Sequence, residues 1–137
     1  MTPAQISLVE HTIAIVDIDE LTRDFYARAF TAEPTLTTMF TTDPERQRER
    51  FAAELAEIVR SIRTVDTFAT RTRSLGERHH GYGVRAPHYA LMGQALLEAL
   101  ANALGESWDD QVAEAWMLAY NLTAETMMLG AMPMPAD

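Results

Sequence analysis

The amino-acid sequence predicts an all-α protein of about six or seven helices. Apolar residues recur three and four positions apart along most of the chain, and proline follows a capping side chain at several segment starts. No segment of useful length alternates apolar and polar residues as a half-buried strand would. A helical fold without a sheet therefore explains the pattern.

The first two helices are expected near the amino terminus. Thr2 places a capping hydroxyl before the first-turn proline Pro3, which predicts a helix start. The apolar stripe of this helix is Ile6, Val9, Ile13 and Val16. Asp19 is expected to cap the second helix. The broad apolar face of the second helix is Leu21, Phe25, Tyr26, Ala29 and Phe30.

Proline and glycine mark the next three segments. Pro34 starts a short turn of helix that ends in Leu36, Met39 and Phe40. Asp43 caps a longer helix with the stripe Phe51, Leu55, Ile58, Val59 and Ile62. Past Thr64 the pattern weakens and predicts a shorter helix that carries Phe68, Leu75, His79 and His80. Gly81 and Gly83 are expected to end it, because glycine tolerates positive φ.

Two long helices are expected in the last third of the chain. Ala86-Pro87 starts one, which Gly105 closes, with the stripe Leu91, Leu96, Leu97, Leu100 and Leu104. Ser107 is expected to cap the other, which ends at Gly130. Its apolar positions are Val112, Trp116, Tyr120, Thr123 and Met127.

Length and composition limit the class of protein. The 137 residues, with 47% hydrophobic and 23% charged, predict one compact domain over residues 1–137. The absence of cysteine excludes disulfides and thiolate metal sites. The formal charge of −9 counts against a nucleic-acid binder. Because no targeting or membrane-spanning segment is found, we expect a soluble, cytoplasmic protein.

The basic residues have an uneven distribution. All 11 are arginine, and nine of them lie between positions 46 and 85, whereas the stretch from Ala86 onward holds no base. Solvated helix faces explain such a section most simply. A local anionic partner is the other interpretation.

The four histidines form no zinc motif of the His-Glu-x-x-His kind, and the sequence has neither a nucleophile elbow nor a phosphate-binding glycine loop. A spaced set of residues remains, which would place one imidazole opposite a phenol and an amide in an aromatic-lined pocket. Its members are Tyr26, Phe30, Phe40, Gln47, Phe51 and His79. Such a pocket suits a planar apolar cofactor whose metal takes one imidazole ligand.

The chain resembles a bacterial single-domain globin, close to the globin domain of flavohaemoglobins. The resemblance covers almost the whole chain and rests on ordered motifs: Asp24 to Phe30, Pro34 to Phe40, Gln47 to Phe51, Arg78 to Val84, Pro87-His88-Tyr89, Gly93, Leu96 and Leu97, and Ala115-Trp116 with Tyr120. It implies a globin fold of six to seven helices around a pocket for haem b, iron protoporphyrin IX.

The resemblance also assigns roles to residues. It implies that His79 is the iron ligand, with Tyr26 and Gln47 as the hydrogen-bonding residues on the opposite, distal side. It places Phe40 against the porphyrin ring, and Val84 and Tyr89 also in contact with the cofactor. Phe51 occupies a position where these globins usually have leucine. Arg78, together with Arg46, Arg48 or Arg50, is a candidate to pair with the haem propionates. His80 stays an alternative ligand, but neighbouring helical residues point about 100° apart, so only one can face the iron.

The function implied is reversible binding of dioxygen, and of nitric oxide or carbon monoxide, for transport or scavenging. Two alternatives stay open: a nitric oxide dioxygenase served by a separate reductase, and the gas-sensing domain of a signalling protein. An exposed apolar stripe on the final helices could also form a homodimer.

The chain departs from flavohaemoglobins in two respects. It ends at Asp137 without their flavin reductase. Their proximal glutamate falls near Pro133, where no acid is present, and Glu125 is the substitute to consider. Without that carboxylate, His79 is expected to donate less electron density to iron.

Overall fold

A computed structural model describes residues 1–40 and 42–132. It contains six α-helices, namely α1 (Pro3–Ile15), α2 (Ile18–Ala32), α3 (Pro44–Ser61), α4 (Val65–Gly81), α5 (Ala86–Leu104) and α6 (Asp110–Gly130). Two short 3-10 helices, η1 (Pro34–Met39) and η2 (Gly105–Ser107), complete the described elements, among which there is no strand. The prediction of an all-α fold is confirmed.

Most helix starts lie where capping chemistry predicts them. Thr2 forms a capping box with Gln5, and the Asp43 carboxylate accepts from the N–H of Arg46. Two predicted caps are wrong. Asp17, not Asp19, caps α2, and Asp109, not Ser107, caps α6, because in each case the aspartate side chain accepts the free N–H groups of the first turn.

The helix expected to be shorter, α4, has 17 residues and nearly matches the 18 of α3. Its apolar stripe is sparse because the helix exposes much of its surface and buries only a narrow face. That face is Phe68, Thr72, Leu75 and Gly76. The weak pattern therefore reflects narrow burial rather than a short helix.

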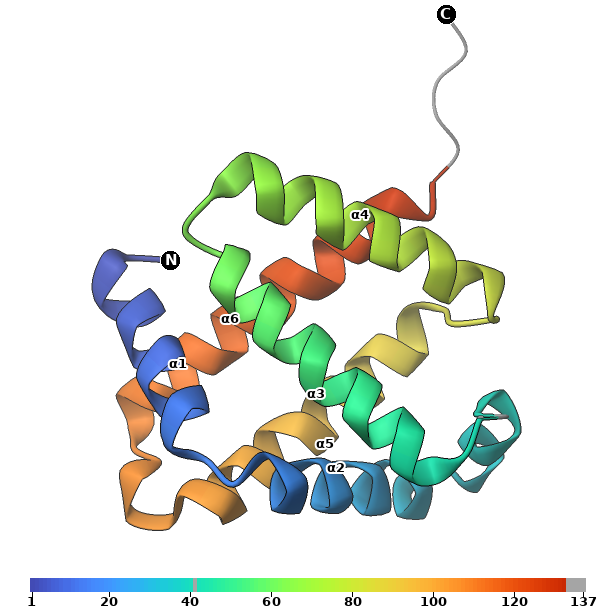
Figure 1. The fold of residues 1–137 in the computed structure, drawn as a ribbon, viewed down its shortest axis with the longest axis horizontal. Coiled ribbons are helices and arrows are strands. Elements are labelled where there is room, and N and C mark those ends of the chain that lie inside the picture. The colour runs from blue at the N-terminus through green and yellow to red at the C-terminus, as the bar shows by residue number, and fades with distance from the viewer. Residues whose placement is uncertain (41, 133–137) are drawn as a thin grey trace, which may run out of the picture.

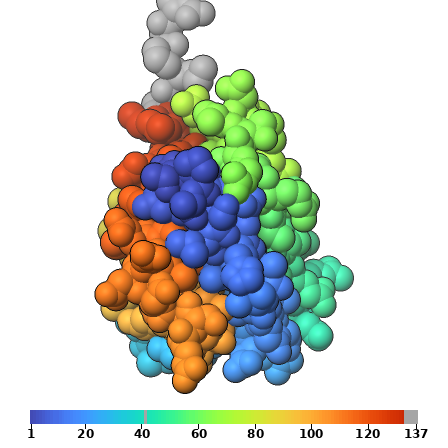
Figure 2. Space-filling model, turned by 90° about the vertical axis from the view of Figure 1, so that its left-hand side faces the viewer, coloured from blue at the N-terminus to red at the C-terminus, as the bar shows by residue number. Residues whose placement is uncertain are grey.

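The helices pack in pairs around one main core. α4 runs along α6, α2 runs along α5, and α3 crosses in front of them (Figure 1). α1 lies on the side of the molecule, between α6 and α3 (Figure 2). A second, smaller apolar cluster joins α4, α5 and α6, and it consists of Leu75, Tyr89, Ala124 and Met127.

One buried hydrogen bond connects the beginning of the chain to α6. The indole N–H of Trp116 donates to the Thr12 hydroxyl over 2.8 Å, and both side chains are buried. The Thr12 hydroxyl in turn bonds the carbonyls of the preceding turn of α1. α1 is therefore held by a specific polar contact as well as by apolar packing.

The outer face of α6 is partly apolar, as the sequence suggested. Met117, Leu118, Leu122 and Leu129 are all exposed on it.

Candidate functional site

A cavity of about 750 Å³ lies among the helices and is lined from α2, α3, α4, α5 and α6. This volume falls in the range of small-molecule and cofactor sites. Eight of the residues that the sequence singled out line it, namely Tyr26, Phe40, Gln47, Phe51, Arg78, His79, Val84 and Tyr89. Phe30, which was also expected in the pocket, does not line the cavity and packs behind Tyr26 and Phe40 instead. The fold thus gathers side chains from four helices and two connections into one site.

His79 projects into the cavity from the last turn of α4. Its ring Nδ1 lies 2.8 Å from the carbonyl oxygen of Leu75, one turn earlier on the helix. Because a carbonyl only accepts, Nδ1 carries the proton and Nε2 keeps its lone pair. Burial lowers the pKa of His79 below its usual 6.5, and the charge of Arg78 lowers it further. The ring is therefore neutral at pH 7 and able to bind a metal through Nε2.

His80 is placed differently from its neighbour. Its side chain is exposed, and it does not line the cavity. The angular separation of neighbouring helical residues explains the difference.

Tyr26 and Gln47 form a polar pair on the cavity wall. The amide Nε2 of Gln47 donates to the hydroxyl oxygen of Tyr26 over 3.3 Å. Tyr26 is only 7% exposed, and burial raises the pKa of its phenol above 10.0 against the opposing effect of the Gln47 hydrogen bond. The phenol is therefore protonated at neutral pH, and since its oxygen accepts from Gln47, its own O–H is available to donate.

Four phenylalanines surround the ring of Tyr26. Ring centroids of Phe25, Phe30, Phe40 and Phe51 lie 4.9, 5.8, 5.6 and 5.7 Å from that of Tyr26. Phe25 and Phe51 are stacked at 4.5 Å. We call these five residues the aromatic cluster. They make this wall of the cavity apolar apart from the Tyr26–Gln47 pair.

The wall near His79 is held by a second phenol. The hydroxyl of Tyr120 donates to the backbone carbonyl of Tyr89 over 2.6 Å. The ring of Tyr120 lies so close to Gly93 that a Cβ atom there would collide with it. Burial raises the pKa values of both Tyr120 and Tyr89. α5 and α6 are thus fixed to each other at the wall of the cavity that also holds His79.

No carboxylate is bonded to His79 within residues 1–40 and 42–132. Glu125 is exposed and does not line the cavity, and the family's glutamate position near Pro133 falls outside the described residues. A carboxylate that sequence reasoning missed, Glu54, does line the cavity, and its charge raises the pKa of His79 slightly against burial. Its helical spacing from Gln47 and Phe51 could have indicated this.

Of the four arginines considered for an anionic group, Arg50 and Arg78 line the cavity, and Arg46 and Arg48 do not. The guanidinium of Arg78 also donates to the Ser74 hydroxyl over 3.2 Å. Arg71 is 3.4 Å from Glu54, which leaves that carboxylate paired. The two charged groups best placed to meet an anion in the cavity are therefore Arg50 and Arg78.

The donor set limits which metal species fits. Among the described residues, no group of three or more His, Asp or Glu side chains could hold a metal ion. One neutral imidazole in a large apolar cavity instead suits a metal carried by a flat organic ligand that supplies most of its coordination. The residues present fit such a group.

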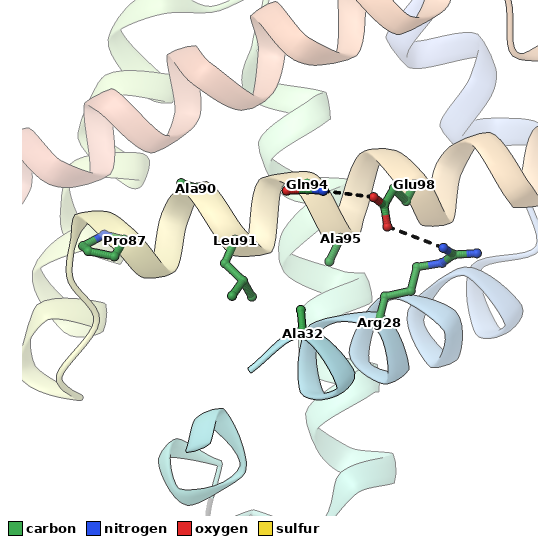
Figure 3. Close-up of a pocket in the computed structure, with 8 residues that line it drawn as sticks. All are labelled: Arg28, Ala32, Pro87, Ala90, Leu91, Gln94, Ala95 and Glu98. Atoms are coloured by element: carbon green, nitrogen blue, oxygen red, sulfur yellow. Dashed lines mark hydrogen bonds and ion pairs between the residues drawn. The ribbon is translucent and has the colours of Figure 1, made fainter. Parts of the chain in front are cut away.

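A second cavity of about 390 Å³ lies between α2 and α5 (Figure 3). Its polar end is occupied by Arg28, which bonds Asp24 over 3.0 Å and reaches Glu98 at 3.5 Å. Glu98 also accepts from Gln94. These charges already satisfy one another, and the cavity contains no residue of the predicted site.

No helix in the described part of the chain is long and apolar enough to span a membrane.

Comparisons with known proteins agree with this geometry. The family model "Globin" matches residues 23–127. Flavohemoproteins of Bordetella pertussis and Deinococcus radiodurans are 29% and 28% identical over 133 residues, covering 93% of this chain. The chain spans about a third of the length of these relatives, since the aligned region is 33% of each.

Solved structures match over nearly the full length. A bacterial globin from Campylobacter jejuni has a TM-score of 0.82 at 24% identity, covering 95% of this chain and 96% of that one. An engineered carbene transferase from Rhodothermus marinus, whose parent is named as a nitric oxide dioxygenase, has a TM-score of 0.82 at 23% identity. It covers 96% of this chain and 93% of its own. At these identities the two structures show a shared fold.

Proposed function

The chain belongs to the globin family, and from this premise we propose that it binds haem b in the 750 Å³ cavity and reversibly binds dioxygen, nitric oxide or carbon monoxide there. The observation that carries the proposal is the placement of a neutral imidazole and a protonated phenol in the same apolar cavity. When bound, haem supplies an iron atom with one position open to a diatomic gas.

In this proposal His79 is the iron ligand. Its Nδ1 is engaged with the Leu75 carbonyl, so Nε2 is the atom that binds. Arg50 and Arg78 hold the two propionates, since they are the arginines of the predicted set that line the cavity. Phe40, Val84 and Tyr89 supply apolar contact to the ring.

Tyr26 is the proposed hydrogen-bond donor to the gas, and Gln47 orients it. With haem in the cavity, the Tyr26 phenol would donate a hydrogen bond toward a partly negative guest such as dioxygen and would slow its release. Carbon monoxide carries much less negative charge, so the hydrogen bond from Tyr26 stabilises it less. The Tyr26–Gln47 pair therefore favours dioxygen over carbon monoxide.

The ligand environment of His79 favours a carrier. Its Nδ1 bonds a neutral carbonyl rather than a carboxylate, so the ring has little imidazolate character and pushes less electron density toward iron. This supports reversible binding over strong activation of dioxygen.

A nitric oxide dioxygenase is the second candidate, favoured by the flavohemoprotein relatives and the Rhodothermus neighbour. It requires one electron per turnover from a separate reductase. Steady nitrate production with a reductase would favour this candidate. Slow autoxidation with tight dioxygen binding would favour the carrier.

The proposal is tested by adding hemin to the full chain and recording absorption spectra of the ferric, ferrous and carbon monoxide forms. We expect stoichiometric uptake, a five-coordinate ferrous spectrum and a sharp shift with carbon monoxide. A chain that folds but leaves hemin free in solution would refute haem binding.

Replacing Tyr26 by phenylalanine removes the phenol O–H and keeps the ring. We expect dioxygen to dissociate about ten to a hundred times faster, since a charge-assisted hydrogen bond contributes about 1.5–3 kcal/mol. Carbon monoxide affinity should change little. Stopped-flow displacement of dioxygen by carbon monoxide measures both, and Tyr120→Phe, which removes a phenol near His79, is the matched control. Equal dissociation rates in Tyr26→Phe and the unaltered chain would contradict the assignment.

A further inference from the structure

Two glycines allow α4 and α6 to touch backbone to backbone. A Cβ atom on Gly76 of α4 would collide with the main-chain carbonyl of Met127 on α6. Likewise, a Cβ atom on Gly130 of α6 would collide with the main chain of Arg73 on α4. Backbone cannot swing aside as the end of a flexible side chain can. Any side chain at either position must therefore move one helix relative to the other.

The first of these contacts lies next to the hydrogen bond that holds the imidazole. Gly76 directly follows Leu75, whose carbonyl accepts from His79 Nδ1 over 2.8 Å. Leu75 and Met127 belong to the same small apolar cluster, and both line the cavity. One of the two turns of α4 that meet the backbone of α6 is thus the turn that orients the ring.

The ring has no anchor on another helix within the described residues. Its side-chain partner is on α4 itself. The backbone carbonyl of His79 accepts from the N–H groups of Tyr82 and Val84, each over 3.0 Å, which fixes the end of the same helix. A displacement of α4 therefore carries the imidazole with it.

We propose that Gly76 is a positioning residue for His79: by seating α4 directly on the backbone of α6, it sets how far Nε2 reaches into the cavity. The role of Nε2 as iron ligand rests on the proposed function. The effect of Gly76 on the position of the ring in the haem-free chain does not depend on the proposed function.

Gly130 provides the matched control. It makes the same kind of contact between the same two helices, but it faces Arg73, about two turns before His79, whereas Gly76 is about one turn before it. Gly76→Ala and Gly130→Ala insert one methyl group each. If Gly76 has only a structural role, the two variants should affect the His79 ring to a similar extent. If Gly76 positions the ring, Gly76→Ala should affect it more than Gly130→Ala does.

Three measurements on the full chain compare the variants: the thermal midpoint, the ¹⁵N shifts of the His79 ring in the haem-free chain, and the iron–histidine stretching frequency of the ferrous hemin-loaded protein. We expect both variants to lower the thermal midpoint. Only Gly76→Ala should shift the ring signals and the stretching frequency strongly, with carbon monoxide affinity changed about tenfold or more.

Equal shifts in the two variants, or none in Gly76→Ala, would overturn the proposal. If Gly76→Ala does not fold, Gly130→Val, which forces the helices apart at the contact further from His79, must lower the thermal midpoint and leave the stretching frequency in place, and a shifted band overturns the proposal. If the unaltered chain takes up no hemin, the proposed function fails. The ring ¹⁵N shifts then still decide the positioning role, because they need no haem.

Discussion

His79→Ala is expected to leave a folded chain that cannot retain haem through an iron–imidazole bond, whereas His80→Ala should bind it normally. The reason is the placement of the two rings: His79 lines the cavity with Nε2 unengaged, and His80 is exposed. Removing the single protein ligand leaves only apolar contacts and the arginines to hold the cofactor. Hemin titration followed by the ferrous and carbon monoxide spectra measures the difference.

Added imidazole provides the control for this experiment. In His79→Gly the side-chain volume is vacant, so free imidazole should enter the cavity and restore a histidine-type ferrous spectrum. Circular dichroism must show that each variant keeps its helices. If His80→Ala abolishes the five-coordinate spectrum and His79→Ala retains it, the ligand assignment is wrong.

Trp116→Ala should cause a large loss of stability in the haem-free chain, because Trp116, which also lines the cavity, fills a site in the main core. The indole is 3% exposed, packs in the main core and donates to Thr12 over 2.8 Å. Emptying a buried aromatic site costs about 3–5 kcal/mol, and the Thr12 oxygen, which keeps its own bonds to the α1 carbonyls but loses the indole donor, adds to the loss. Urea unfolding of the haem-free chain, followed by circular dichroism, measures the free energy of unfolding.

Trp116→Phe separates the contribution of the buried ring from that of the hydrogen bond to Thr12. It keeps most of the buried ring and removes the indole N–H, so we expect a loss of about 1–3 kcal/mol. The double variant Thr12→Val with Trp116→Phe should recover part of that loss, because the Thr12 oxygen that Trp116→Phe leaves without a donor is then absent. A Trp116→Ala variant that unfolds at the same urea concentration as the unaltered chain would refute the role of this contact.

Helix starts were predicted best where proline fixes the position. Pro3, Pro34, Pro44 and Pro87 each occupy the first turn of a helix, as expected. The two wrong caps arose where capping side chains stand two residues apart. Asp17 and Asp19 have the same chemistry, and only the path of the preceding chain decides which one accepts the first-turn N–H groups.

The sequence placed eight residues that line one cavity, but it also placed Phe30 there, which packs behind Tyr26 and Phe40. Glu54 was missed because a carboxylate on a helix face is usually solvated, and its paired position beside Arg71 depends on where α4 crosses α3. The glycine contacts between α4 and α6 were missed for a similar reason. Periodicity identifies the face of a helix but not the distance to its neighbour.

The aromatic cluster couples ligand size to folding. Phe51 lines the cavity and is stacked on Phe25, which is 2% exposed in the core between α2 and α3. Replacing Phe51 by a smaller residue to admit a guest bulkier than a diatomic molecule, such as an alkyl isocyanide, would remove that stack. The room for a ligand and the packing of α2 on α3 therefore depend on the same pair of rings. Substitutions that widen this wall for larger guests should lower the melting temperature in proportion to the room they create.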